Sequence, residues 1–256
     1  ASQPLYQKYG KVSSVKLIYH IEDKKIHFIP SKKYRFHFDY CRTHFEPFLT
    51  VDEFNQRNYS QVEDRNYFIG NLNYYESSNQ YALEISSSVE LNKAQLETFF
   101  HSIKDNIFYD INLSFIVNTS AGQSLKDSLE IPILMPSAVY KNQKFQSIHQ
   151  GIAYGKLVFV ENQKQLDTIP THSIVILNGS PVNLPLCKGI VTNTFQTPLS
   201  HIQILAKNRK MPSAAFKGNL SHLKELNGKE VELKITNDTL FISATKNKIG
   251  DTKTRK

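Results

Sequence analysis

The sequence is poor in cysteine and has no long hydrophobic runs. Its two cysteines, Cys41 and Cys187, lie far apart, and neither belongs to a Cys-x-x-Cys motif. We therefore expect no disulfide framework and no cysteine-based zinc site. This usage suits a reducing compartment, and a cytoplasmic location is expected. No run approaches the roughly 18 to 20 apolar residues that a membrane-spanning helix needs, so a membrane partner is not expected.

A concentrated basic surface is also missing. The formal net charge is +8, which favours anionic partners by general attraction. The charge is gathered only in the tail, residues 246–256, while Lys24-Lys25 and Lys32-Lys33 are isolated pairs. A nucleic-acid-binding protein more often carries a basic stripe with interleaved aromatic residues. No nucleic-acid partner is therefore expected.

The first half of the chain has the pattern of an α+β domain. Aromatic and β-branched runs separated by polar turns predict antiparallel strands, and Asn92 is a good N-cap for a helix whose apolar residues share one face. We expect a domain of unknown role over residues 1–135. Its expected elements are hairpins over 15–29 and 66–86, a helix over 92–107, a strand over 113–117 and a short helix over 121–129.

A change of texture follows the first domain. Residues 136–147 are expected to form a linker, and glycine becomes denser after it. Short strands interleaved with helices predict a compact β/α domain over residues 148–245. The alternation in Glu230–Ile235, followed by the turn at Asn237-Asp238, predicts a hairpin near its end. Residues 246–256 are expected to be a polar tail or linker.

A Ser-His pair opens one predicted helix of this second domain, in the stretch TPLSHIQILA. Ser200 can cap the helix, and His201 lies on the first turn, where the ring need not be buried. The free N–H groups and the helix dipole favour an anion there and disfavour an imidazolium. The setting suits a nucleophilic histidine that carries a phosphoryl group. Spacing alone favours a packing residue for His201, and it leaves a metal ligand or a base as further possibilities.

The stretch GIVTNTFQTPLSHIQILAKNRKMPSAAF resembles the mobile phosphohistidine domain of phosphoenolpyruvate-utilising enzymes. That superfamily includes pyruvate phosphate dikinase, phosphoenolpyruvate synthase and the glucan water dikinases. The resemblance covers residues 148–243. Its motifs include the following residues: Thr197, Ser200, His201, Leu205-Ala206, Met211-Pro212-Ser213-Ala214 and the closing Leu226-Asn227-Gly228. The fold class it implies is an α+β N-terminal domain followed by a swivelling β/β/α phosphohistidine domain.

The resemblance also implies a function. His201 would relay a phosphoryl group from ATP or phosphoenolpyruvate to an unknown acceptor, as part of a dikinase-type phosphotransferase. Thr197, Ser200 and Lys207 would stabilise the phosphoryl group. The chain has no glycine-rich GxxxxGK loop, so no cofactor and no metal is expected on it. ATP and Mg²⁺ would bind an ATP-grasp domain, a partner expected on the C-terminal side in the full-length protein.

The sequence departs from the family at several places, one of which is Leu199, directly before Ser200, where many members have threonine. Phe195-Gln196 stands where members usually have a pair of glycines, and Lys207 replaces a common arginine, so it would act on a phosphate as a point charge. These departures bear on the rate of transfer and on the acceptor. The alternative is a module without catalytic activity that keeps the swivelling fold and binds a partner or a carbohydrate.

The first domain offers two further groups of candidate residues. His37, Asp39, Cys41 and His44 could hold a metal, but their spacing matches no named zinc pattern. Alternation in FHFDY favours instead a strand with His37 and Asp39 on one face. Several tyrosines could line a carbohydrate platform, although tyrosine on a sheet more often packs with a hydrated hydroxyl. These are Tyr59, Tyr67, Tyr74, Tyr75 and Tyr81.

Overall fold

A computed structural model describes most of the 256-residue chain, and its residues separate into two compact units. The first unit comprises residues 1–6 and 10–140, and the second comprises residues 7–9 and 141–256. Among the described residues, no helix combines the length and the apolar character needed to cross a bilayer. The structure describes residues 5–7, 10–59, 65–86, 88–141, 143–160, 165, 168–177, 186–197 and 200–245, excluding the side chains of residues 5–7, 10, 11, 120 and 201.

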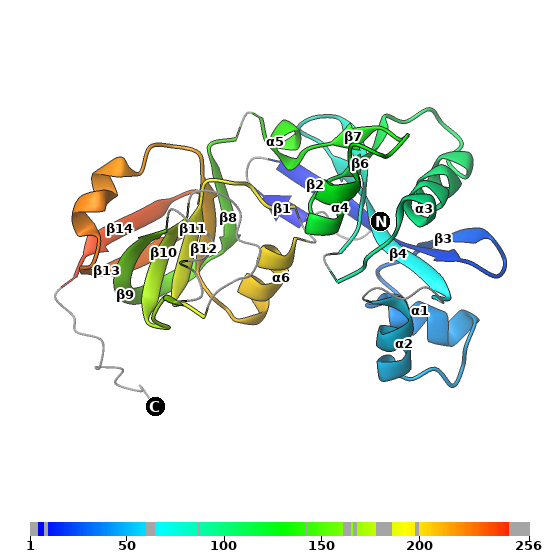
Figure 1. The fold of residues 1–256 in the computed structure, drawn as a ribbon, viewed down its shortest axis with the longest axis horizontal. Helices are drawn as coiled ribbons and strands as arrows, with labels where there is room; N and C mark the ends of the chain where they lie inside the picture. Colours follow the sequence, from blue (N-terminus) through cyan, green and yellow to red (C-terminus); the bar gives the residue numbers. More distant parts are fainter. Residues whose placement is uncertain are drawn as a thin grey trace. The chain divides into compact units, whose positions relative to one another are not determined.

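The first unit is built on a mixed sheet. The hairpins expected from the sequence are confirmed, since β2 pairs antiparallel with β3 and β4 pairs antiparallel with β5. β6 and β7 extend the sheet in parallel. The described strands are β1 (Leu5–Gln7), β2 (Gly10–His20), β3 (Lys25–Ile29), β4 (Tyr67–Tyr75), β5 (Gln80–Glu84), β6 (Leu113–Ile116) and β7 (Ile133–Leu134). Their order is β1-β2-β4-β5-β6-β7, with β3 on β2 (Figure 1).

The helix α3 (Lys93–Asp105) connects the parallel strands β5 and β6, which need such a crossover. Asn92 is its N-cap, as expected from the sequence. The Asn92 side chain accepts the N–H of Gln95 at 2.9 Å, and the Gln95 side chain accepts the N–H of Asn92 at 3.1 Å. The apolar face of the helix is buried in the core of the unit: Leu96, Phe99, Phe100 and Ile103. Shorter helices α4 (Ser120–Leu125) and α5 (Pro136–Val139) follow.

The strand expected for FHFDY is wrong, because α1 (His37–His44) occupies this segment. The carboxylate of Asp39 accepts the backbone N–H of Phe36 at 2.8 Å, which satisfies an N–H group that the first turn leaves free. Thr43 then donates its hydroxyl to the Asp39 carbonyl, one turn earlier, at 2.7 Å. A second helix, α2 (Val51–Asn58), has Thr50 as its N-cap, and the Thr50 hydroxyl accepts the N–H of Glu53.

The second unit contains its own mixed sheet. Its described strands are β8 (Phe145–His149), β9 (Gly151–Val160), β10 (Ser173–Leu177), β11 (Gly189–Thr192), β12 (Ser213–Phe216), β13 (Glu230–Ile235) and β14 (Leu240–Ala244), in the order β14-β13-β9-β10-β11-β12-β8. The middle strands β9 to β12 run parallel, and β8, β13 and β14 are antiparallel to their neighbours. The hairpin expected near the end is confirmed as β13–β14.

The segment 136–147, expected to be a linker, carries structure at both ends. It contains α5, and its last residues Phe145 to Ser147 belong to β8, which pairs with β12. Gln146 lies opposite Ala215 in this pair. The first strand of the second unit's sheet therefore begins three residues before the predicted start of the second domain, residue 148. The sequence also predicts a helix over 163–169 and a loop over 178–185. The first lies mainly, and the second entirely, outside the described residues.

One α-helix of the second unit connects two neighbouring parallel strands. α6 (His201–Asn208) follows β11, precedes β12 and packs against β8 (Figure 1). The 3₁₀ helix η2 (Ser221–Leu226) follows β12 and buries Leu223 against a core cluster on the sheet. A crossover between parallel strands starts where the first strand ends. The segment that leads to the first turn of α6 therefore leaves the sheet at the carboxyl ends of its parallel strands.

Candidate functional site

Ser200 is the N-cap of α6, and it fixes the turn at which the Ser-His pair stands. Its backbone is extended, with φ −60° and ψ 142°, and its hydroxyl accepts the N–H of Gln203 at 3.3 Å. The N–H of Ser200 donates to the carbonyl of Thr197 at 3.0 Å. Thr197 and Ser200 are 1% and 4% exposed. Two residues expected at the site are therefore brought together by the turn that leads into the helix.

Two buried glutamines, Gln146 and Gln203, hold this turn from the neighbouring elements. The side chain of Gln146, from β8, accepts the N–H of Gln196 and donates to its carbonyl, both at 2.7 Å. Gln203, from α6, donates to the same carbonyl at 3.4 Å. Buried polar groups need such partners, because a group that loses its hydrogen bonds to water and gains none in the protein destabilises the folded state. The segment before α6 is thus tied to both a strand and the helix.

The pair that replaces the glycines of the resembled family supports the same segment. Phe195 is 3% exposed, and the ammonium of Lys217 lies 4.6 Å from the centre of its ring. Gln196 also donates its side-chain amide to the carbonyl of Thr194 at 2.9 Å. Two side chains that pack and form hydrogen bonds therefore stand where glycine would leave the backbone free to move.

His201 is the first residue of α6, and the structure describes its backbone. Its imidazole, together with Pro198 and Leu199, lies outside the described residues. The first turn of a helix leaves backbone N–H groups without helical acceptors and carries the positive end of the helix dipole. This arrangement can bind oxygen atoms of an anionic group. The role of His201 as a phosphoryl carrier stays a prediction.

Lys207 lies in the last turn of α6, away from the Ser-His pair. It follows His201 by six positions, which corresponds to about 9 Å along a helix axis. The residue is exposed, although desolvation by its surroundings lowers the pKa of its ammonium. The structure therefore groups Thr197 with Ser200 and places Lys207 at the other end of the helix. Its expected role in neutralising a phosphoryl group stays a prediction.

The four candidate metal ligands of the sequence all lie on α1, but their side chains contact different partners. They are His37, Asp39, Cys41 and His44. His37 donates from Nε2 to the carbonyl of Gly70 at 3.1 Å, whereas Nε2 of His44 forms a hydrogen bond with the hydroxyl of Tyr34 at 2.8 Å. Cys41 is fully buried, which raises the pKa of its thiol far above the ordinary value. In the described part of the chain, no set of three or more His, Cys, Asp or Glu residues is placed to hold a metal ion.

The tyrosines of the first unit do not share one exposed platform. Tyr67 and Tyr75 are each 1% exposed and belong to the interior. The hydroxyl of Tyr67 donates to the carboxylate of Glu46 at 2.7 Å. Tyr74 and Tyr81 form a cross-strand pair with ring centres 4.7 Å apart. A carbohydrate platform built from all five tyrosines is therefore not present.

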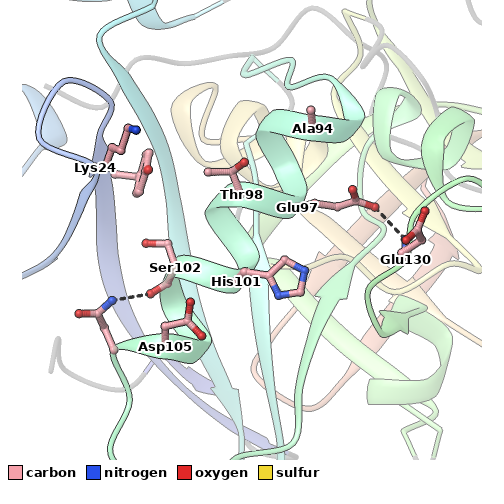
Figure 2. A pocket seen from close by; sticks show the side chains of 10 residues that line it. Lys24, Ala94, Glu97, Thr98, His101, Ser102, Asp105 and Glu130 are labelled. Carbon is pink, nitrogen blue, oxygen red and sulfur yellow. Dashed lines mark hydrogen bonds between the residues drawn. The ribbon is translucent and has the colours of Figure 1, made fainter.

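A polar cavity of about 790 Å³ lies along α3 in the first unit (Figure 2). Glu97, Thr98, His101, Ser102 and Asp105, all from α3, line it. Figure 2 shows Glu97 beside Glu130, and here the N–H of Glu130 donates to the Glu97 carboxylate at 2.8 Å. These carboxylates already have partners, including Lys93, which lies 2.8 Å from Glu130 and 3.8 Å from Glu97. The cavity therefore has the character of a solvated helix face.

Comparison with known proteins adds little to this geometry. No protein-family model matches the chain, and no curated protein matches it. Among the solved structures that match is an MccF-like protein from Bacillus anthracis strain Ames, with 15% sequence identity and a TM-score of 0.28. The match covers 40% of this chain and 42% of that structure, so it spans less than half of the other protein. A similarity of this size carries no argument about fold or function.

Proposed function

We propose that the second unit is a phosphohistidine carrier of the kind found in phosphoenolpyruvate-utilising enzymes, with His201 as the residue that is phosphorylated. The observation that carries the proposal is the position of His201 at the first residue of α6, directly after a capped and hydrogen-bonded turn. The resemblance over residues 148–243 supplies the class of reaction. The supporting contacts come from Ser200, Thr197 and the buried glutamines around them.

The proposed step is a phosphoryl transfer to nitrogen. The lone pair of one imidazole nitrogen of His201 attacks phosphorus, and an N–P bond forms while the P–O bond to the leaving group breaks. The leaving oxygen keeps the electron pair. The phosphoryl oxygens then lie near the N–H groups at the start of α6, where the helix dipole favours negative charge. Ser200 and Thr197 act as positioning residues, because they fix the turn before the helix.

The donor and the partner follow from the same resemblance. We infer that the phosphoryl group comes from ATP or phosphoenolpyruvate and that an ATP-grasp domain, carrying ATP and Mg²⁺, delivers it. That domain would lie on the C-terminal side in the full-length protein. Because a relay of this kind requires the carrier to reach two sites, the second unit would move as one body. The proposal includes a cytoplasmic location, because ATP and phosphoenolpyruvate are supplied in the cytoplasm.

The test uses the two Ser-His pairs of the chain. Ser221-His222 repeats the dipeptide at the exposed start of η2, so His222→Ala is a matched control for His201→Ala. Each protein is incubated with an ATP-grasp partner domain and labelled ATP or phosphoenolpyruvate. Acid-labile label is expected on the wild type and on His222→Ala and is expected to be absent from His201→Ala.

Equal labelling of His201→Ala would remove His201 as the carrier. An absence of label from the wild type, with a partner that is shown to be active, would favour the alternative of a non-catalytic module that binds a partner or a carbohydrate. Mass spectrometry of the labelled peptide under alkaline conditions identifies the modified residue directly.

A further inference from the structure

A pocket of about 500 Å³ lies where the parallel strands of the second unit end. Val160, Leu177 and Phe216 are the last residues of β9, β10 and β12, and Asn193 directly follows β11. All four line the pocket. Open sheets with parallel strands bind ligands at the carboxyl ends of those strands. The topology therefore places this pocket at the edge where a ligand is expected.

The inner wall of the pocket is apolar. Phe159 and Phe216 contribute aromatic rings, and these rings and Leu220 pack against the core cluster that contains Ile176, which is 6% exposed. Ligand pockets for small molecules occupy roughly 300 to 1,000 Å³ and are lined mainly by such side chains. The size and the wall suit a small molecule with an apolar ring or chain.

Gly218 allows the ring of Phe216 to lie against the backbone at this wall. A Cβ atom at position 218 would stand 2.2 Å from Cζ of Phe216. A side chain there would therefore have to displace the ring. The absence of a side chain at this position is part of what shapes the pocket.

The outer rim of the pocket is polar and carries a positive charge. Asn193, Asn219, Ser221 and Lys224 lie there, and each is exposed. Asn219 is held in place, because its side-chain oxygen accepts the N–H of Ser221 at 2.8 Å. Among the described residues that line the pocket, none is an aspartate or a glutamate, and Lys224 is the charged one. A ligand with a negative group at the rim would complement this charge.

We propose that this pocket binds a small organic anion, with an apolar ring or chain against Phe159 and Phe216 and a carboxylate or phosphate group near Lys224. The proposal does not require phosphoryl transfer through His201. It does place the ligand at the sheet edge from which the chain leads to α6, since Asn193 begins the segment that ends at Ser200. Binding and phosphorylation can therefore be measured separately.

The test is methyl NMR of the full chain with Ile, Leu and Val methyl groups labelled. Benzylphosphonate and phenylacetate combine a ring with an anion and distinguish phosphate-like from carboxylate ligands. Benzyl alcohol has the ring without the charge, and inorganic phosphate has the charge without the ring. Saturable shifts of the Ile176 and Leu220 methyl signals are expected with at least one of the first two compounds, at concentrations where the other two cause little change.

Charge variants at the rim test the second half of the proposal. Lys224→Gln is expected to weaken binding about threefold to fivefold, the range of an exposed ionic contact, and Lys224→Glu is expected to weaken it further. Lys229→Gln is the control, because Lys229 is exposed in the same unit and does not line the pocket. The proposal is overturned if no compound gives saturable shifts at Ile176 and Leu220, if benzyl alcohol binds as tightly as the anions, or if both Lys224 variants bind as the wild type does.

Discussion

The side chain of Gln146 forms two hydrogen bonds with the backbone of Gln196, one to its N–H and one to its carbonyl, each 2.7 Å long. The two residues are 50 positions apart in sequence and both are buried. The amide of Gln146 thus pairs with the loop before α6 in the way a neighbouring strand would. Because Gln146 belongs to β8, the start of the helix is tied to the edge of the sheet.

Replacing Gln146 with leucine should destabilise the second unit by about 2 to 4 kcal/mol, because the N–H and the carbonyl of Gln196 would each lose a buried partner. Urea unfolding followed by circular dichroism measures the change. Gln150→Leu is the matched control, since Gln150 lies close by in sequence and is exposed. It should change the free energy of unfolding by less than about 0.5 kcal/mol. Equal effects of the two substitutions would show that the buried contact contributes little.

Removing the cap hydroxyl in Ser200→Ala should cost about 1 kcal/mol. The effect should be local, because Oγ of Ser200 accepts the N–H of Gln203 in the first turn. Hydrogen exchange measured by mass spectrometry should show faster exchange in peptides from α6 and little change in the first unit. Ser221→Ala provides the comparison, because Ser221 is exposed and is not the N-cap of η2. Unchanged exchange in α6 would contradict the importance of this cap.

Adding a methyl group in Gly155→Ala should destabilise the second unit, although a glycine-to-alanine change in a compatible backbone usually stabilises by about 0.4 to 1 kcal/mol. The new Cβ atom would stand 2.2 Å from the carbonyl oxygen of His172, a backbone atom that cannot rotate away. A loss of about 1 to 3 kcal/mol, typical of overpacking, is expected. Thermal unfolding measures the sign, and an unchanged or higher melting temperature would mean that β9 and the chain before β10 separate easily.

Acidification should destabilise the first unit through two partly buried histidines, His37 and His27. Burial lowers the pKa of His37 to about 4 from an ordinary value of 6.5, and burial also lowers the pKa of His27. The folded state therefore favours the neutral rings, whereas the unfolded chain takes up protons near pH 6.5. The contribution of His37 is fully present above pH 6.5 and is lost as the pH falls towards 4.

Between pH 7 and pH 4 the loss from His37 should amount to about 3 kcal/mol. Unfolding free energies measured between pH 7 and pH 4 should fall less steeply in His37→Gln than in the wild type. His101→Gln, on the exposed face of α3, serves as the control. The same steepness in all three proteins would assign the acid sensitivity to other groups.

Local patterns predicted much of the secondary structure. The helix α3 was readable because Asn92 and Gln95 cap it and its apolar residues repeat with helical spacing. The hairpins were readable from β-rich runs around polar turns. The helix at the short segment FHFDY could not be predicted, because five alternating residues are compatible with a strand or a helix. The helix is capped by the hydrogen bond from the N–H of Phe36 to the carboxylate of Asp39. Propensity alone does not contain that contact.

The sequence predicted only part of the candidate site. Ser200 could be recognised as a cap from its place before an apolar helical pattern. The glutamines that support the turn could not, since they come from separate elements and meet only after folding. A weak signal existed in Gln146, a polar residue within an otherwise strand-like run. The family resemblance grouped Lys207 with His201, although a helix separates side chains that are six positions apart.

The pairing of β8 with β12 decides where the second unit can be cut from the chain. The predicted domain start, residue 148, falls inside β8 (Phe145–His149). A cut there would remove Phe145 and Gln146, which pair with Phe216 and Ala215 of β12. A recombinant fragment that began there would expose the edge of β12 and would leave Gln196 without the amide that orders the approach to α6. A fragment that begins at residue 141, the first residue of the second unit after the first unit ends, keeps both.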